Sequence, residues 1–150
     1  MATNLRTTFQ LLMRRYSTLS ENCCDICCDS DISLFQSDIM HEIKRHHNPS
    51  MQQIACSLGI DTTTFSRQVK TLIERRLVKK TPDSQDNRIQ ILSLTEEGEK
   101  LNTKIEQQVN SNLEQVLSKL SEFERQSVIN ALHLLDLAML QSFLCCPPPK

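Results

Sequence analysis

The 150-residue sequence has no tryptophan, only two glycines and few aromatic side chains, which make up 4% of its residues. Two glycines leave no glycine-rich loop for a phosphate and no elbow for a catalytic nucleophile. A hydrophobic content of 39% without tryptophan also makes a thin core for a solitary domain of this length. These absences argue against an enzyme and in favour of an oligomer.

The chain also lacks a long apolar run and a large net charge. In the N-terminal stretch, Leu5, Phe9, Leu12 and Tyr16 recur at helical spacing and do not form the apolar block of a signal peptide or membrane span. We therefore expect a cytoplasmic protein with no membrane partner. Because the net charge is −1, a polyanion must be met by a local cluster of basic residues.

Helical periodicity dominates most of the sequence. The predicted helices cover approximately residues 4–20, 34–47, 51–59, a segment from residue 62 past Ile73, 96–120, and a last segment from residue 122 up to Cys145. Ser50 and the Ser121–Glu124 pair provide helix caps, and Asp61 or Thr62 provides another. The cysteine-rich stretch with Asp29-Ser30-Asp31 is interpreted as a break or an irregular turn. In the alternative, a helix that continues over residues 22–29, its four cysteines lie at i, i+3 or i, i+4 on overlapping faces.

The middle of the chain predicts a DNA-binding fold. Alternating residues in Leu77–Lys80 and Ile89–Leu94 flank a polar segment and indicate a two-stranded hairpin. Two short helices joined by a turn at Gly59 precede it, which is the order of a winged helix-turn-helix. The expected fold is mainly α, a winged helix-turn-helix with a small β-hairpin wing and a helical dimerisation lobe.

Basic residues concentrate on the second of these helices and on the wing. From Arg67 to Arg88, seven basic side chains outnumber three acidic ones by four. Arg67 and Lys70 can reach base edges or phosphates, Thr63 and Ser66 can donate to either, and Arg88 can enter a minor groove. The alternative, a solvated basic face on a small helical domain, is disfavoured by the order of the elements.

Residues 50–95 resemble the DNA-binding lobe of MarR-type transcriptional regulators. The motifs that carry the resemblance are Leu58-Gly59, Ser66-Arg67, Leu77-Val78, Asp86-Asn87-Arg88 and, five residues later, Leu94-Thr95-Glu96-Glu97-Gly98. The first helix and the last two match the dimerisation lobe of that family in order and length. One departure is Arg76, which stands where many members have glycine and needs a helix-ending conformation there.

The resemblance implies residue roles at the DNA. It implies that Asp86 orients basic side chains of the wing and that Arg88 enters the minor groove. Together with the pattern of the second helix, it predicts DNA-binding residues at Thr62, Thr63, Thr64, Ser66, Arg67, Lys70, Asp86 and Arg88.

The resemblance also implies a homodimer formed by the first and last helices. The near-heptad spacing of Val128, Leu132 and Leu135 favours the same conclusion independently. A two-fold dimer presents two recognition helices about one DNA turn apart, so its double-stranded operator must be pseudo-palindromic. The chain then divides into N-terminal dimerisation and cysteine-rich sensor helices (1–47), the DNA-binding lobe (48–95), and C-terminal dimerisation helices with a Cys-Pro tail (96–150).

Six of the seven cysteines occur as adjacent or near-adjacent pairs. They are Cys23, Cys24, Cys27, Cys28, Cys145 and Cys146. An odd cysteine count and a reducing compartment argue against a disulfide framework, and thiolates are soft ligands. We expect these residues to capture a thiophilic inducer, with trivalent arsenic or antimony ahead of Zn(II), Cu(I) or an iron–sulfur cluster. No cofactor is obligatory, and the ligand-free protein is expected to act as a repressor.

Several alternatives remain open. The cysteines can respond by oxidation, although Asp25 and Asp29 disfavour thiolates, or they can be structural in a regulator that senses a small molecule. Histidines 41, 46 and 47 can bind zinc but are more typical of solvated helix ends, and Cys56 is interpreted as incidental. An enzyme and a protein-interaction adaptor are the competing functional classes.

Overall fold

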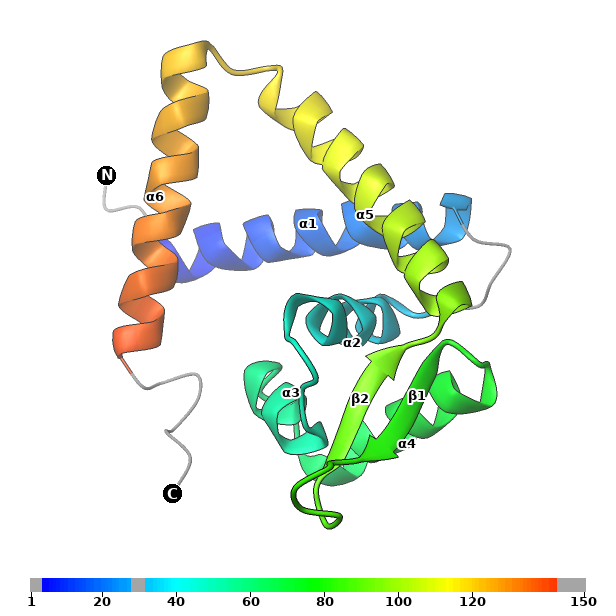
Figure 1. Ribbon diagram of the computed structural model, residues 1–150. Coiled ribbons are helices and arrows are strands. Elements are labelled where there is room, and N and C mark those ends of the chain that lie inside the picture. The colour runs from blue at the N-terminus through cyan, green and yellow to red at the C-terminus, as the bar shows by residue number, and fades with distance from the viewer. Residues whose placement is uncertain (1–3, 28–31, 143–150) are drawn as a thin grey trace.

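The computed structural model describes residues 4–27 and 32–142, and within these ranges all side chains except those of residues 21–27. This part of the chain is mainly helical, as predicted, with one two-stranded sheet (Figure 1). Its elements are α1 (Leu5–Cys27), α2 (Leu34–Arg45), α3 (Met51–Ser57), α4 (Thr62–Glu74), β1 (Val78–Pro82), β2 (Gln90–Leu94), α5 (Glu96–Leu117) and α6 (Glu122–Gln141). No helix in this part is long and apolar enough to cross a membrane.

Side-chain caps fix where most helices begin. Ser33, Ser50 and Ser121 each accept the third backbone N–H of the following helix, and the residue at that third position bonds back to form a capping box. Asp61 and Thr95 cap α4 and α5 in the same way through one side-chain oxygen each. The caps predicted at Ser50 and Ser121 are thus confirmed, and Asp61 is the cap of α4.

The structure contradicts the predicted break in the cysteine-rich stretch up to Cys27. Helix α1 continues without interruption from Leu5 to Cys27, seven residues past the predicted end. The stretch ENCCDIC contains neither glycine nor proline, so nothing in it removes a backbone hydrogen bond or favours a turn strongly enough to end the helix.

A single hydrophobic core lies inside what we call the winged lobe, which comprises α2, α3, α4 and the β1–β2 hairpin. Phe65, Val69 and Leu72 of α4 are almost completely buried, as their spacing predicted. They pack with apolar residues from α2, α3 and both strands, including Ile39 and Ile54. Helix α2, which the sequence-based division places in the N-terminal segment, therefore contributes directly to the core of the winged lobe.

The α2–α3 junction is held by one carboxylate. Ser57 donates from Oγ to Glu42 at 2.6 Å, and Arg45 donates through two nitrogens to the two carboxylate oxygens at 2.9 Å each. Burial opposes ionisation, but hydrogen bonds from Arg45 and Ser57, with the charges of Arg45 and His46, lower the pKa of Glu42 to about 2. The side chain of Glu42 is only 13% exposed, so this bond set ties the two helices firmly.

The hairpin is joined to its neighbours on both sides. Its antiparallel register runs from Val78 opposite Leu94 to Pro82 opposite Gln90, and Leu92 N–H bonds to the Pro49 carbonyl at 2.9 Å. At the start of α5, Thr95 Oγ1 donates to the Arg76 carbonyl at 2.6 Å. A Cβ at Gly98 would overlap the Leu77 carbonyl oxygen, so this position requires glycine for close approach of the two backbones.

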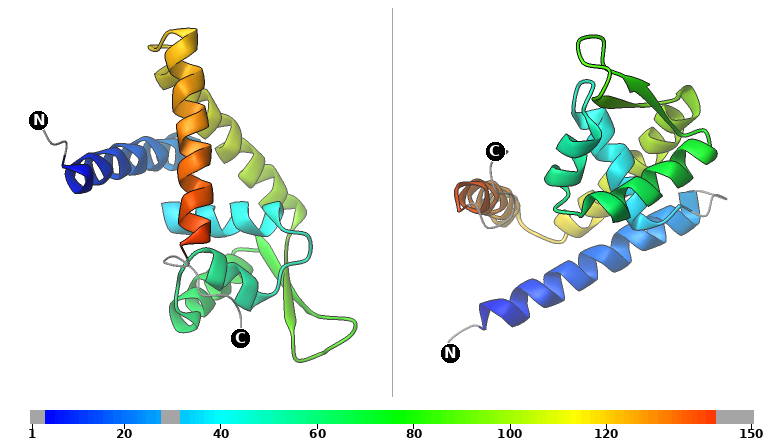
Figure 2. Two further views of the ribbon diagram at one scale, coloured as in Figure 1. Left: turned by 90° about the vertical axis from the view of Figure 1, so that its left-hand side faces the viewer. Right: turned by 90° about the horizontal axis from the view of Figure 1, so that it is seen from below.

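Helices α1, α5 and α6 lie outside the winged lobe. Helices α5 and α6 diverge from their junction at the top of Figure 1, and α1 packs across α5 and α2. The two further views in Figure 2 show α6 as a separate rod beside the rest of the chain. Not one residue of α6 is buried.

Candidate nucleic-acid interface

The outward face of α4 carries the predicted recognition residues. Because Phe65, Val69 and Leu72 point into the core, the opposite side of this helix faces solvent. All six predicted positions on the helix are exposed: Thr62, Thr63, Thr64, Ser66, Arg67 and Lys70. Five of them line one shallow hollow along the helix surface; these are Thr62, Thr63, Ser66, Arg67 and Lys70.

The start of α4 is fixed by Asp61. Hydrogen bonds from the side chain and the backbone N–H of Thr64 lower the pKa of Asp61, whose Oδ1 lies 2.9 Å from that N–H. The carboxylate therefore stays ionised, and its negative charge interacts favourably with the positive end of the helix dipole. This cap orients the first turn, on which Thr62, Thr63 and Thr64 lie.

The two cationic side chains of the helix differ in their surroundings. Lys70 Nζ lies 3.9 Å from Glu74, in a pair whose side chains are 79% and 63% exposed, so water weakens the attraction strongly. No hydrogen bond or ion pair holds the guanidinium of Arg67 to any other residue in the described ranges. Both charges are thus available to an external polyanion.

The wing tip presents Arg88. Asp86 Oδ1 accepts the backbone N–H of Arg88 at 3.0 Å and lies 3.7 Å from its Nε. Two backbone bonds of 2.9 Å, Asp83 N–H to Ile89 O and Ile89 N–H to Asp86 O, close the loop. The Arg88 side chain is 94% exposed, and the wing lies at the end of the molecule opposite the α5–α6 junction, together with α3 and α4 (Figure 1).

Arg76 adopts the unusual conformation that the sequence predicted. Its φ is +61°, in the left-handed region that favours glycine, and its N–H bonds to the Ile73 carbonyl at 2.9 Å. This residue ends α4 and turns the chain into β1. The hydrogen bond from Thr95 to its carbonyl holds the strained turn in place.

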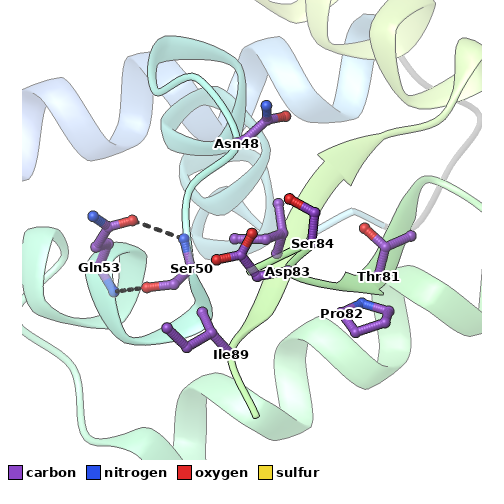
Figure 3. Close-up of a pocket in the computed structure, with 9 residues that line it drawn as sticks. Asn48, Ser50, Gln53, Thr81, Pro82, Asp83, Ser84 and Ile89 are labelled. Carbon is purple, nitrogen blue, oxygen red and sulfur yellow. Dashed lines mark hydrogen bonds between the residues drawn. The ribbon is translucent and has the colours of Figure 1, made fainter. Parts of the chain in front are cut away.

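A polar hollow lies between the start of α3 and the part of the wing where β1 ends and its loop begins (Figure 3). Its lining residues come from the loop before α3, from α3 and from the wing: Asn48, Ser50, Gln53, Thr81, Pro82, Asp83, Ser84, Ile89 and Ile91. The capping bonds between Ser50 and Gln53, at 2.8 and 3.1 Å, form one wall. The Asp83 carboxylate disfavours an anion here, so phosphate contacts are better provided by α4 and the wing tip.

The sequence did not predict a side-chain hydrogen bond between α2 and α4. Gln36 Nε2 donates to Gln68 Oε1 at 3.0 Å, and Gln36 is only 8% exposed. The two glutamines are 32 positions apart, and the local capping box of Ser33 and Gln36 does not predict that Gln36 also reaches Gln68. Only the packing of α2 against the recognition helix brings them together.

A more enclosed cavity of about 400 Å³ lies between α1, α2 and α5. Tyr16, Asp38, His41 and Glu106 contribute polar groups to its lining, and burial raises the pKa of Asp38. Asn102 also lines it, is 1% exposed, and has no hydrogen-bond partner for its Nδ2 within the described ranges. Sequence reasoning missed this cavity because its residues come from three separate helices.

Metal binding by the histidines has no geometric basis in the described residues. His41 Nδ1 lies 3.0 Å from Glu106, and His46 Nε2 lies 3.3 Å from Glu42, so each is paired with a carboxylate. Among the side chains that the structure describes, no three histidine, cysteine or acidic groups gather closely enough for a metal ion. Cys56 is exposed on α3, as expected.

The predicted cysteine site lies outside the described side chains. Cys23, Cys24 and Cys27 belong to α1, but their side chains are not described. Cys28, Cys145 and Cys146 lie wholly outside the described residues. The site therefore stays a prediction from the sequence.

Known proteins share both the sequence of the winged lobe and the whole fold. Residues 32–90 match the family model of the MarR family. YybA of Bacillus subtilis (strain 168), an uncharacterized HTH-type transcriptional regulator, is 26% identical over 105 residues, which are 69% of this chain and 70% of YybA.

Two solved structures illustrate the shared fold. Staphylococcus aureus MarR in complex with salicylate and kanamycin has a TM-score of 0.77 and 24% identity, covering 90% of this chain and 89% of that one. CouR, a transcriptional repressor bound to a 23-mer DNA duplex, has a TM-score of 0.77 and 19% identity, covering 88% and 92%. The family match over residues 32–90 and the similarity to YybA support a MarR-family winged helix-turn-helix regulator.

Proposed function

We propose that the chain is a homodimeric repressor that binds a pseudo-palindromic operator through α4 and the wing. The observation that carries this proposal is the exposed hydroxyl-rich and basic face of α4, together with an almost fully exposed Arg88 at the wing tip on the same end of the molecule. A helix of this width fits the major groove, while an arginine beside it suits the minor groove. CouR, which has the same fold, is bound to a DNA duplex.

Exposed apolar side chains on α1 and α6 support the dimer. On α1 the most exposed are Leu5, Leu12 and Met13, at 52–69%. On α6 the near-heptad residues Val128, Leu132 and Leu135 are 37–51% exposed. Water disfavours so many exposed apolar side chains, and a second copy can cover them through a symmetric interface.

Salt-dependent binding to duplex DNA tests the operator proposal. Arg88→Ala is expected to weaken binding of a selected palindromic duplex and to reduce its salt dependence by about one phosphate contact, with the dimer intact. Fluorescence anisotropy over a range of salt concentrations measures both effects. An unchanged affinity would remove the wing from the interface, whereas a complete lack of duplex binding would favour an enzyme or an adaptor.

The proposed inducer is a thiophilic ion, with trivalent arsenic or antimony first. The N-terminal cluster Cys23, Cys24, Cys27 and Cys28 would supply thiolates, helped by Cys145 and Cys146. In support, three of these cysteines belong to α1, which packs against both α2 and α5. A ligand there can bias the arrangement of the winged lobes only through its different affinity for the two arrangements.

The inducer is tested on the reduced protein–operator complex. Arsenite, antimonite, Cu(I), Zn(II) and hydrogen peroxide are added separately to the wild type, to a variant with serine at the four clustered positions, and to the control Cys56→Ser. Arsenite or antimonite is expected to release DNA from the wild type and the control only. Release by peroxide alone would replace coordination by oxidation, and an equal response of the serine variant would exclude the cluster as sensor.

A small organic inducer is the second candidate, and the cavity between α1, α2 and α5 favours it. Among the described residues, the buried Nδ2 of Asn102 has no hydrogen-bond partner, and Asn102 lines this cavity, so a ligand with a hydrogen-bond acceptor would satisfy it. Salicylate, which is bound to the S. aureus MarR, is a suitable probe. It should raise the melting temperature of the wild type but not of Asn102→Leu; equal shifts in both would place it elsewhere.

A further inference from the structure

We propose that Arg67 is the residue of α4 that specifies sequence, through a guanine in each half-site, and that its neighbour Gln68 is withheld from the bases by Gln36. This inference rests on the proposed operator binding. It goes further by naming which side chain discriminates between base pairs and which one does not.

The amide of Gln68 is already engaged inside the protein. Its Oε1 accepts from Gln36 Nε2 at 3.0 Å, and the side chain is only partly exposed. A glutamine reads adenine by using its carbonyl oxygen and its NH₂ group together. Gln68 would have to give up the bond to α2 before it could do so.

The partner of Gln68 is itself held firmly. Gln36 Oε1 accepts the backbone N–H of Ser33 at 3.3 Å, while the backbone N–H of Gln36 donates to Ser33 Oγ at 3.2 Å. The amide of Gln36 therefore bonds at both ends, in a side chain that is 92% buried. This rigid arrangement keeps Gln68 turned towards α2 and away from the exposed face.

The remaining side chains of that face discriminate poorly. Thr62, Thr63, Thr64 and Ser66 carry single hydroxyl groups, which donate to or accept from many base edges. Lys70 offers one ammonium, which Glu74 partly attracts at 3.9 Å, and an ammonium suits a phosphate as well as a base.

Arg67 differs from all of these residues. Its guanidinium has parallel donors in a rigid fork that matches O6 and N7 of guanine. Within the described ranges no other residue competes for it, and it lines the hollow at the centre of the exposed face. The outward face of α4 thus offers one discriminating group, and that group favours guanine.

Selection from a pool of random duplexes tests the inference with full-length protein. The wild type is expected to enrich a motif with one fixed G·C pair in each half-site. Arg67→Lys keeps the charge but loses the fork, so preference at that pair should fall at least about tenfold while other positions stay unchanged. Gln68→Ala should retain the whole motif, and Lys70→Ala should weaken binding to all sequences about equally.

Other outcomes would overturn the inference. An Arg67→Lys motif identical to that of the wild type would show that Arg67 contacts phosphate only, and loss of an A·T position in Gln68→Ala would show that Gln68 reads a base. Wild-type protein that binds duplexes without enriching any motif would overturn the inference and leave DNA binding intact. Failure to bind any duplex would overturn the proposed function as well.

Discussion

The winged lobe and α6 place similar apolar residues in opposite surroundings. Phe65 in the winged lobe is 1% exposed, whereas Phe123 in α6 is 83% exposed. The winged lobe closes its core with residues of one chain, while α6 buries none of its own. The core of the winged lobe is therefore complete in one copy, whereas the apolar surface of α6 is the surface that the proposed second copy would cover.

Removing the same side chain from each region tests this contrast most strongly. Phe65→Ala should lower the free energy of unfolding by about 3–5 kcal/mol, because it removes a buried ring and leaves a cavity. Phe123→Ala, the matched control, should change the stability of the dissociated monomer by less than about 0.5 kcal/mol. Urea unfolding at low protein concentration measures both values, and comparable losses would contradict the contrast.

Two neighbouring leucines of α6 test which face of this helix forms the proposed dimer. Leu135 belongs to the near-heptad series, whereas Leu134 beside it does not. Leu135→Ala should weaken dimerisation by about 2 kcal/mol, roughly 30-fold, as for a central interface residue. Leu134→Ala is the control for analytical ultracentrifugation, and an equal effect of the two substitutions would move the interface to another face of the helix.

The pH dependence of stability tests the carboxylate that joins α2 to α3 within the winged lobe. The pKa of Glu42 in the folded chain, about 2, lies below its ordinary value of 4.5, so its contribution is complete above about pH 4.5 and is lost as the pH falls towards 2. Glu42→Gln should therefore lower the free energy of unfolding by about 1–2 kcal/mol at pH 7, and this loss should become smaller as the pH falls from about 4.5 towards 2. Urea titrations over this pH range measure the cost, and a difference for Glu42→Gln that stays constant with pH would contradict the assignment.

The smallest expected effect concerns the strained turn at the end of α4. Arg76→Gly should raise the free energy of unfolding by about 1 kcal/mol, because glycine adopts a φ of +61° without a Cβ clash. Arg75→Gly is the matched control; its φ is −81°, so the same substitution should lower stability by about 0.5–1 kcal/mol. A loss of stability in both variants would show that the arginine at position 76 makes a compensating contact.

The features that the sequence predicted correctly are mostly local. Ser50 and Ser121 precede glutamine and glutamate at the spacing of a capping box, so their bonds depend on four residues only. The exposed face of α4 follows from the period of its three buried residues. At the wing, the closely spaced Asp86 and Arg88 form one loop for the same reason.

The features that the sequence missed depend on packing between distant segments. The Gln36–Gln68 bond and the cavity beside Asn102 require α2 to lie against both α4 and α5. The length of α1 was underestimated because charged and cysteine residues resemble a loop in composition, although no helix breaker is present before Cys27. Local propensity does not reveal such long-range outcomes.

Because Gly98 lies in close contact with Leu77, the hairpin and α5 move together as one unit. With 22 residues and a rise of about 1.5 Å per residue, α5 is roughly 33 Å long. A tilt of about 6° around its far end displaces the hairpin by roughly 3.4 Å, which is the rise of one nucleotide step along a DNA strand. A rotation of a few degrees at the distal end of α5 is thus enough to move the wing out of register by one base pair.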